Sequence, residues 1–514
     1  SFTPNNVFDT LRCLRATTST GPDGIPNILL KKLCGQLALP LSHIFTISFN
    51  SQQVPDDWKH AHVKPLFKNG VASDPNNYRP ISLTSTCCRV MERIINKELI
   101  DYLLDKSLVS KEQHGFIRRR STCSNLLECL QDWMLSIDNK RITDVIYIDF
   151  KKAFDQVSHN KLLLKLNSYG ITGDLYGWIK SFLSNRTQAV KLDGCLSSVI
   201  AILSGVPQGS VLGPILFVLF INDLVDCFKN LAVSTKLFAD DLKLYTSYGL
   251  TDSSCDLTEA LHRVTVWAKK WQLTINSTKC NVLRIVNPRC KNKSDIVYDL
   301  NGSSLKVLSV VKDLGVAVDK NLRFDNHISS VVHKSLQRAN LILKCFQSRD
   351  RSLLMKAFKV YVRPLLEYAT PVWSPHFMYL ILKIEHVQRS FTKRLFGLKN
   401  LTYSDRLKQL EIDTLERRRL IYDLCTCFKI IHGYNDTCLD MNRMHLEGRP
   451  NNTRGHNLKL AKEMCRTDML RFFFCNRICT VWNSLPLDVV NAPSVNSFKK
   501  RVSKFNLDRF LTLK

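Results

Sequence analysis

The sequence has no long hydrophobic run, no C-x-x-C pair, no internal repeat and no low-complexity tract. Its longest strongly apolar run, from Pro214 to Ile221, is far too short to cross a bilayer. No signal-peptide pattern opens the chain. We therefore expect no membrane among its partners and an intracellular location, in the nucleus, the cytoplasm or both.

Standard zinc-ligand spacing is also missing, although the chain holds 18 cysteines. The nearest approach to a zinc site would combine Cys425, Cys427, His432, Cys438, Cys475 and Cys479. Their spacing matches no standard zinc finger. We prefer the interpretation that the cysteines are free and mostly buried thiols in a reducing compartment.

Acidic residues are too few to balance the basic ones. The chain has 73 Lys and Arg against 45 Asp and Glu, a net charge of +28. This surplus favours a polyanionic partner such as nucleic acid, the alternative being a merely soluble basic protein. A hydrophobic share of 45% predicts a folded core, and a length of 514 residues predicts two to four domains.

Part of the positive charge lies in residues 331–363, which carry eight Lys and Arg against one acid, Asp350. Apolar residues recur there at helical spacing, at Val332, Leu336, Ala339, Leu343 and Phe346. This pattern predicts helices that bury one face and offer the other to phosphates. A plainly solvated charged face is the alternative.

The order of patterns predicts a mixed helix-and-strand region up to about residue 325 and an almost wholly helical region after it, as separate structural units. The expected elements are a turn at 21–24, a helix at 84–104, a strand at 144–150, helices over 158–183 with a break at 170–173, a loop at 205–209, a helix at 211–224, a hairpin at 235–247, a helix at 256–271, and strands at 281–286 and 305–318.

Two segments combine apolar runs with carboxylates. Asp149 ends a predicted buried strand, where an uncompensated carboxylate is costly, and Asp240 and Asp241 lie at a predicted hairpin tip. Such carboxylates are typical of sites that hold two metal ions roughly 3.5–4 Å apart for phosphoryl or nucleotidyl transfer. Taken alone, an Asp-Asp pair is more often a solvated turn, and nearby Asp155 also fits a helix cap.

These segments belong to a series of blocks that follow one another along the chain: STGPDGIP (19–26), WKHAHVKPLFKNG to NNYRPISLT (58–84), QHGFIRRRST (113–122), YIDFKKAFD (147–155), GVPQGSVLGPILF (205–217), FADD (238–241), WAKKWQLTINSTK (267–279) and DLGVAVD (313–319). In sequence and order the blocks resemble those of reverse transcriptases of non-LTR (LINE-type) retrotransposons, close to the jockey and CR1 elements. In that family the block at 58–84 belongs to the fingers, the blocks at 147–155, 205–217, 238–241 and 267–279 are motifs A, B, C and D, and the block at 313–319 is the primer grip. The resemblance continues more weakly to about residue 510 and includes VWNSLP at 481–486.

The resemblance implies an α+β right-hand polymerase with fingers, palm and thumb, followed by a mainly helical C-terminal region. It implies four parts: an N-terminal extension (1–57), fingers and palm (58–325), thumb-like basic helices (326–365), and a helical C-terminal region of unknown role (366–514).

The resemblance also implies roles for individual residues. Asp149, Asp240 and Asp241 match the catalytic carboxylates, and the Phe150 carbonyl matches a further contact to two Mg²⁺ ions, for which Mn²⁺ can substitute. The other implied contacts are Lys68 and Arg79 to the triphosphate, Phe154 to the nucleotide sugar, Gln208 to nucleotide and template, Lys279 as general acid, Leu314, Gly315 and Val316 as primer grip, and Arg118, Arg119, Arg120, Lys334, Arg338 and Lys344 to nucleic acid.

Several of these residues have plainer interpretations. Phe154 fits an ordinary core position, Lys68 an ordinary surface lysine, and residues 314–316 a simple strand turn. Arg417–Arg419 fit either a contact to the template or a solvated helix face.

The implied activity is an RNA-directed DNA polymerase that uses an RNA template, a DNA or RNA primer and dNTPs. The alternatives are a polymerase like those of group II intron maturases or telomerases, a viral RNA-dependent RNA polymerase, which the bulky Phe154 disfavours, and an inactive nucleic-acid-binding remnant of an element. Because the chain opens on Ser1, we expect a piece of a larger polyprotein or a processed product. No endonuclease block precedes residue 19 and no ribonuclease H pattern follows, so we expect this fragment not to nick DNA. The oligomeric state is not predicted.

Overall fold

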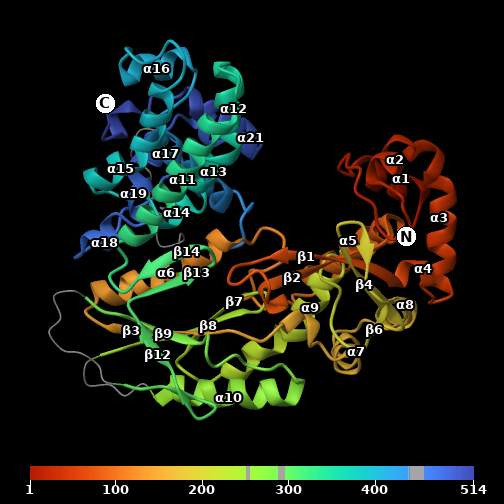
Figure 1. Cartoon of the computed structure of the whole chain (residues 1–514). Helices are drawn as coiled ribbons and strands as arrows, with labels where there is room; N and C mark the ends of the chain where they lie inside the picture. The colour runs from red at the N-terminus through yellow and green to blue at the C-terminus, as the bar shows by residue number, and fades with distance from the viewer. Residues whose placement is uncertain (250–254, 288–295, 438, 440–455, 514) are drawn as a thin grey trace.

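The protein combines strands and helices in its first two thirds and is helical in its last third (Figure 1). The structure, a computed structural model, describes residues 1–249, 255–287, 296–437, 439 and 456–513. Within these ranges no strand follows Asp319, so the predicted change to an all-helical region near residue 325 is confirmed.

A five-stranded sheet at the centre has the order β12-β9-β3-β8-β7. Neighbouring strands in this sheet run antiparallel, except that β12 runs parallel to β9. The strands are β3 (Ile142–Ile148), β7 (Ser234–Phe238), β8 (Asp241–Tyr248), β9 (Asn281–Ile285) and β12 (Lys306–Leu308).

Both faces of the central sheet are buried, which explains the nearly continuous apolar run of β3. Ile146 and Ile148 pack into one hydrophobic core, together with α9 (Gly213–Ile221) and α10 (Cys255–Trp271). Val145, which points to the opposite face, packs into a second core that includes the apolar side of α6 (Thr122–Asp138).

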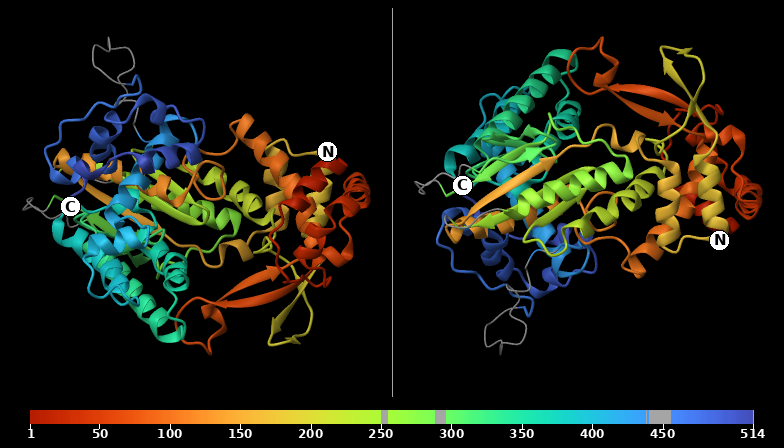
Figure 2. Two further views of the ribbon diagram at one scale, coloured as in Figure 1. Left: turned by 90° about the horizontal axis from the view of Figure 1, so that it is seen from above. Right: turned by 90° about the horizontal axis from the view of Figure 1, so that it is seen from below.

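A second sheet lies toward the N-terminus and has the order β2-β1-β4-β5, with β6 paired to β4. Figure 2 shows that its two hairpins, β1–β2 and the one built on β4, project from the same side of the molecule. The strands are β1 (His60–Phe67), β2 (Tyr78–Leu83), β4 (Arg186–Leu192), β5 (Cys195–Leu196) and β6 (Ile200–Ile202). The surrounding helices are α1 (Pro4–Arg12), α2 (Asn27–Lys32), α3 (Cys34–Asn50), α4 (Asp56–Lys59), α5 (Thr86–Asp105), α7 (His159–Ser168) and α8 (Gly173–Leu183).

The predicted strand at 305–318 is wrong as a single element. The segment forms β12 and then a separate antiparallel hairpin of β13 (Val310–Asp313) and β14 (Val316–Asp319). The predicted helix at 211–224 ends at Ile221, where a 3₁₀ segment, η3 (Asn222–Phe228), begins. A further strand pair, β10 (Asp299–Leu300) with β11 (Ser303–Ser304), precedes β12.

The C-terminal helices pack on the second face of the central sheet, because they share one hydrophobic core with α6 and with Val145 of β3. The helices after residue 325 therefore share a hydrophobic core with the region before it. The division of the chain into four parts stays a prediction. The helices are α11 (Asp325–Cys345), α12 (Arg351–Tyr361), α13 (Arg363–Glu367), α14 (Thr370–Trp373), α15 (Met378–Lys393), α16 (Tyr403–Gln409), α17 (Leu415–Ile431), α18 (Asp468–Arg471), α19 (Phe474–Asn483), α20 (Leu487–Val490) and α21 (Val495–Lys504).

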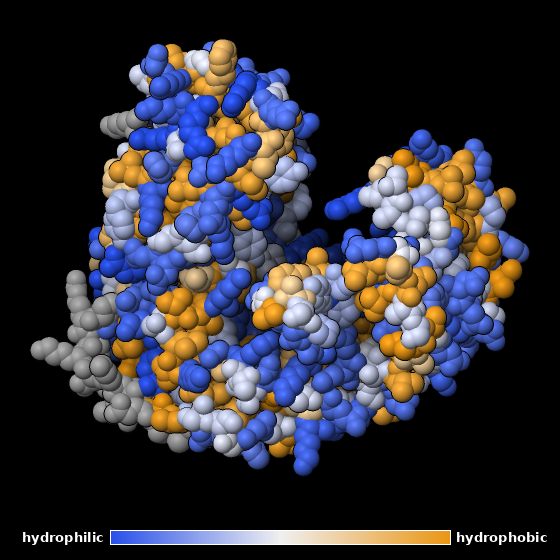
Figure 3. All heavy atoms as spheres, in the orientation of Figure 1, coloured by the Kyte–Doolittle hydropathy of each residue, from blue (hydrophilic) through white to orange (hydrophobic). Residues whose placement is uncertain are grey.

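A wide hollow separates the C-terminal helices from the N-terminal helices in the space-filling view (Figure 3). None of the helices in the described part of the chain combines the length and the apolar character that a bilayer crossing requires.

Candidate active site

The three predicted catalytic carboxylates lie together at one end of the central sheet. Asp149 directly follows β3, and the pairing of Ile148 with Leu242 places Asp149 beside Asp241 at the start of β8. Asp240 occupies the turn between β7 and β8, in which Phe238 pairs with Asp241. The predicted hairpin is therefore confirmed, and its register brings the carboxylates together.

The turn of this hairpin is held by a segment from another part of the chain. Ala239 has a φ of 56°, a left-handed conformation that is uncommon for a residue other than glycine. The side-chain oxygen of the fully buried Gln113 accepts hydrogen bonds from the backbone amides of Ala239, at 2.9 Å, and Gly115, at 2.8 Å. Gln113 therefore fixes the position of the turn that carries Asp240.

Gln113 belongs to the block at 113–122, but the sequence does not predict that its side chain holds the turn at Ala239. The only local signal is Gly115, where an added Cβ would lie 2.3 Å from the Ala239 nitrogen. A glycine that must be approached so closely marks contact with another backbone segment, but nothing in the sequence identifies that segment as the catalytic hairpin.

The electrostatics of the carboxylates favour a compensating positive charge. Protein atoms crowd the Asp241 carboxyl, although solvent still reaches the residue, and this desolvation raises its pKa to about 7, with further contributions from Asp240, Asp313 and Asp149. Burial and the Asp149 charge also raise the pKa of Asp240. A bound divalent cation would relieve both effects.

The predicted triphosphate contacts, Lys68 and Arg79, approach the same site from the N-terminal sheet. Arg79 lies on β2 and Lys68 directly follows β1, and both side chains are exposed. Their positive charges act against the increase in the pKa of Asp240. The two cations are thus free to meet a ligand and near enough to act on the carboxylate.

Residues of motifs A and B pack against each other beside the carboxylates. The half-buried ring of Phe154 stacks on Phe217, with the centroids 4.2 Å apart, so the alternative of a core residue has direct support. Gln208 donates to the Asp155 carboxylate at 2.9 Å. At Gly209, with a φ of 132°, an added Cβ would lie 2.2 Å from the Ser82 carbonyl oxygen.

The predicted primer-grip residues form the turn between β13 and β14. Leu314 and Gly315 both have positive φ, 43° and 89°, as a two-residue type I′ turn requires. Val316 is fully buried in β14, and the Tyr368 hydroxyl donates to the Leu314 carbonyl at 2.7 Å. Lys243 ties the hairpin to the central sheet through a buried ion pair with Asp313 at 3.0 Å.

Some side chains that are predicted to contact nucleic acid are exposed, whereas others already bind groups of the protein. Lys334, Arg338 and Lys344 are exposed on α11, which buries its apolar face as predicted. Arg120, in contrast, donates to the backbone carbonyls of Ser110 and Gln113, both at 2.7 Å.

The other two arginines of this tract pair with acids. Arg118 pairs with Asp101, and Arg119 lies 3.9 Å from Asp436. Their contact to nucleic acid, like that of Arg120, stays a prediction.

The interpretation of Arg417–Arg419 as a solvated helix face is wrong. Arg419 is only 2% exposed, and Arg418 pairs with Glu367. Arg417 donates to the backbone carbonyls of Ser503 and Phe505, at 3.0 Å each. The partners of Arg417 and Arg418 come from distant parts of the chain, so the sequence around α17 does not reveal them.

The thiols considered for a zinc site are free. Cys425, Cys427, Cys475 and Cys479 are buried and unpaired, and His432 contacts the Val490 carbonyl. Cys438 lies outside the described residues. Within the described part of the chain no group of three or more His, Cys, Asp or Glu side chains is close enough to hold a metal ion as arranged.

The carboxylates of Asp149, Asp240 and Asp241 are likewise too far apart to hold one metal ion as arranged, so a cation would have to draw them closer together. Their chemistry nevertheless fits Mg²⁺, which prefers carboxylate oxygens, and a divalent ion would relieve the mutual repulsion that raises the pKa values of Asp240 and Asp241. Lys279 is exposed on the loop that precedes β9.

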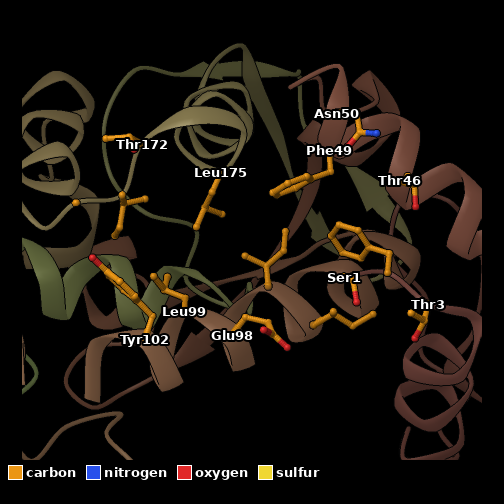
Figure 4. A pocket seen from close by; sticks show the side chains of 15 residues that line it. Ser1, Thr3, Thr46, Phe49, Asn50, Glu98, Leu99, Tyr102, Thr172 and Leu175 are labelled. Carbon is orange, nitrogen blue, oxygen red and sulfur yellow. The ribbon is translucent and has the colours of Figure 1, made fainter. Parts of the chain in front are cut away.

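The cavity of about 690 Å³ shown in Figure 4 is a different feature. It lies between α3, α5 and α8, and is lined by apolar side chains such as Phe49, Leu99 and Leu175. None of the predicted site residues lines it.

A mostly antiparallel sheet that gathers carboxylates at one end, near cations from a second sheet, suits nucleotidyl transfer, for which enzymes use two metal ions. Residues 66–318 match the family described as reverse transcriptase (RNA-dependent DNA polymerase). This part of the chain belongs to the reverse transcriptase family.

Similar proteins agree with the predicted type of reverse transcriptase. The chain is 30% identical over 407 residues to the RNA-directed DNA polymerase from mobile element jockey of Drosophila funebris, covering 77% of this chain and 44% of that protein. It is 29% identical over 386 residues to the probable RNA-directed DNA polymerase from transposon BS of Drosophila melanogaster, covering 72% of this chain and 42% of that protein. The predicted resemblance to the jockey type is confirmed, and the chain spans less than half the length of these relatives.

A solved structure of apo telomerase from Candida tropicalis, truncated from the C-terminal domain, is similar at 14% identity and a TM-score of 0.38. The match covers 56% of this chain and 59% of that one. The assignment to the family does not depend on this likeness.

Proposed function

We propose that this chain is the polymerase part of a non-LTR retrotransposon protein, which extends a primer 3′ end with dNTPs on an RNA template. The observation that carries the proposal is the meeting of Asp149, Asp240 and Asp241 at one end of the central sheet, close to Lys68 and Arg79. The family of residues 66–318 supports it.

In this proposal the carboxylates, together with the Phe150 carbonyl, hold two Mg²⁺ ions, for which Mn²⁺ can substitute. When bound, the ions would activate the primer 3′-hydroxyl and neutralise charge on the triphosphate and the leaving pyrophosphate. Arg79 and Lys68 bind the triphosphate oxygens, Arg79 through its planar fork of donors. Lys279, which is exposed on the loop before β9, would act as the general acid to the leaving pyrophosphate.

The finer architecture follows from these roles. The N-terminal sheet would act as fingers, the central sheet as palm and the exposed cations of α11 as part of a thumb. Template and primer would then lie in the hollow that separates the C-terminal helices from the N-terminal helices (Figure 3). An intracellular place of action, in nucleus or cytoplasm, goes with a nucleic-acid template.

Primer extension tests the proposal. Purified protein is incubated with an oligo(dT) primer on poly(rA), Mg²⁺ and either dTTP or UTP. Extension with dTTP supports a reverse transcriptase, and extension with UTP in preference would indicate an RNA polymerase. No extension, with intact binding of the template–primer, would indicate the inactive nucleic-acid-binding remnant.

A further inference from the structure

The loop between α10 and β9 is joined directly to the strand end that carries Asp149. The backbone amide of Asn276 donates to the Asp149 carbonyl at 2.7 Å, and the amide of Lys151 donates to the Thr274 carbonyl at 2.8 Å. Phe150 pairs with Ile275 between these two hydrogen bonds. The loop therefore continues the central sheet for a few residues beyond the end of β3.

The side chain of Asn276 adds a contact to the carboxylate itself. Its amide nitrogen donates to Asp149 Oδ2 at 3.1 Å. The Thr278 hydroxyl donates to the amide oxygen of Asn276 at 2.8 Å. An ionised carboxylate only accepts hydrogen bonds, so the NH₂ group of Asn276 must face Asp149, and the amide oxygen is left to accept from the Thr278 hydroxyl, which holds the amide in place.

The loop also supports Asp149 from behind. The Asp149 amide donates to the sulfur of Cys280 at 3.4 Å, and the Cys280 thiol donates to the Asn276 carbonyl at 3.2 Å. Cys280 is 2% exposed, so this side of the loop is packed. The amide, carbonyl and carboxylate of Asp149 are therefore all held by residues 276–280.

We propose that Asn276 is a positioning residue, which holds Asp149 Oδ2 so that Oδ1 is left for the divalent cation, while Thr278 holds the Asn276 amide in place through its oxygen. Within the described residues no hydrogen bond occupies Oδ1. A ligand oriented by a neutral donor binds a cation without first losing rotational freedom, and such supporting contacts are typically worth 10–100-fold in metal affinity or activity. The inference rests on the proposed function, because it needs Asp149 to be a metal ligand.

Asn276 is a neutral donor and does not protonate Asp149. The Asp149 carboxylate therefore stays an acceptor, as a metal ligand must be. A purely structural asparagine would contribute to the loop through its backbone contacts, which a side-chain substitution leaves in place.

The test compares Asn276→Ala and Thr278→Val with the wild type. Thr278→Ser is the conservative variant that keeps the hydroxyl, and Ser277→Ala is the matched control in the same loop. Binding of Mn²⁺ to the protein–template–primer complex is measured by the electron paramagnetic resonance of free Mn²⁺. The Mg²⁺ concentration for half-maximal extension and the Tm are measured on the same proteins.

We expect Asn276→Ala to weaken Mn²⁺ binding, and to raise the half-maximal Mg²⁺ concentration, by about tenfold or more. We expect Thr278→Val to weaken Mn²⁺ binding and to raise the half-maximal Mg²⁺ concentration by a smaller factor. Thr278→Ser and Ser277→Ala should match the wild type in both quantities. Mn²⁺ binding and Mg²⁺ dependence within twofold of the wild type in Asn276→Ala would overturn the proposal. If Asn276→Ala does not fold, Thr278→Val decides in the same way.

The failure of the proposed function gives a different result. In that case the wild type itself extends no primer, or Asp240→Ala extends it equally well. If the wild type extends the primer, Asp240→Ala does not, and Asn276→Ala behaves as the wild type, only the role of Asn276 is wrong.

Discussion

At the scale of single residues, the ring of Phe154 is held by two other aromatic rings. Its ring stacks on Phe217 in a nearly parallel arrangement, at 4.2 Å and 15°, while the residue remains half-buried. Phe116 meets it edge-on at 6.3 Å. A ring fixed in this way is a rigid surface that can exclude a 2′-hydroxyl by steric contact, without a hydrogen bond.

We expect Phe154→Val to raise the incorporation of rNTP relative to dNTP by about tenfold or more, because the clash with the 2′-hydroxyl is removed, a change of about 1.4 kcal/mol or more. The measurement is the kcat/KM ratio for dCTP and CTP on one primer. Phe217→Leu serves as the control, since it disturbs the stack from the core side and should reduce the use of both sugars equally. An unchanged ratio in Phe154→Val would remove this residue from the substrate site.

At the scale of elements, the hairpin that carries Asp240 and Asp241 depends on a contact with a segment distant in sequence. The segment with Gln113 and Gly115 lies against the turn at Ala239, and the amide of His114 donates to the Leu237 carbonyl at 2.9 Å. Any side chain at residue 115 would meet backbone, which cannot move aside without moving the turn and Asp240 with it.

We therefore expect Gly115→Ala to displace the hairpin and to reduce primer extension roughly 100-fold, the order of loss that a misplacement near 1 Å can cause. Gly35→Ala is the control, because an added Cβ on this helical glycine meets no atom within 4 Å. The turnover of dTTP on poly(rA) and the Tm are measured together. Full activity in Gly115→Ala would show that the hairpin does not need this contact.

The elements also show how far sequence reasoning reaches. The strand of Asp149, the hairpin of Asp240 and the helices around them could be predicted, because apolar periodicity and turn residues are local signals. The contacts of Gln113 with the hairpin and of Asn276 with Asp149 could not, because each joins segments more than 100 residues apart through a polar side chain that has no periodic signature. The alternative of a solvated face at Arg417–Arg419 is wrong for a related reason, since the carbonyls to which Arg417 donates lie more than 80 residues further along the chain.

At the scale of the whole molecule, the net charge is +28, and part of the positive charge is exposed on α11. Lys334, Arg338 and Lys344 are exposed on α11. Within the described residues no acid forms an ion pair with them. Such cations are available to a nucleic-acid backbone, whereas Arg417 and Arg418 pair with groups of the protein and Arg419 is buried.

We expect replacement of these three cations by Gln to weaken binding of the template–primer and to reduce its salt dependence by about one unit of log–log slope for each lost phosphate contact. The measurement is the Kd over a series of salt concentrations. Replacement of the exposed Lys269, Lys500 and Lys504 by Gln removes the same charge elsewhere and should change the slope less. Equal slopes for the two triple variants would mean that α11 contributes only net charge.

The proposed polymerase activity requires the carboxylates at the end of the central sheet. The most direct measurement is primer extension on poly(rA) by the wild type, Asp240→Ala and Asp149→Ala, with the exposed Asp57→Ala on α4 as the matched control and with template binding and Tm measured in parallel. We predict that Asp240→Ala and Asp149→Ala abolish extension while template binding and Tm are kept, and that Asp57→Ala behaves as the wild type. Extension by Asp240→Ala within about tenfold of the wild type, a cost of about 1.4 kcal/mol or less in the barrier, would contradict the assignment of this site.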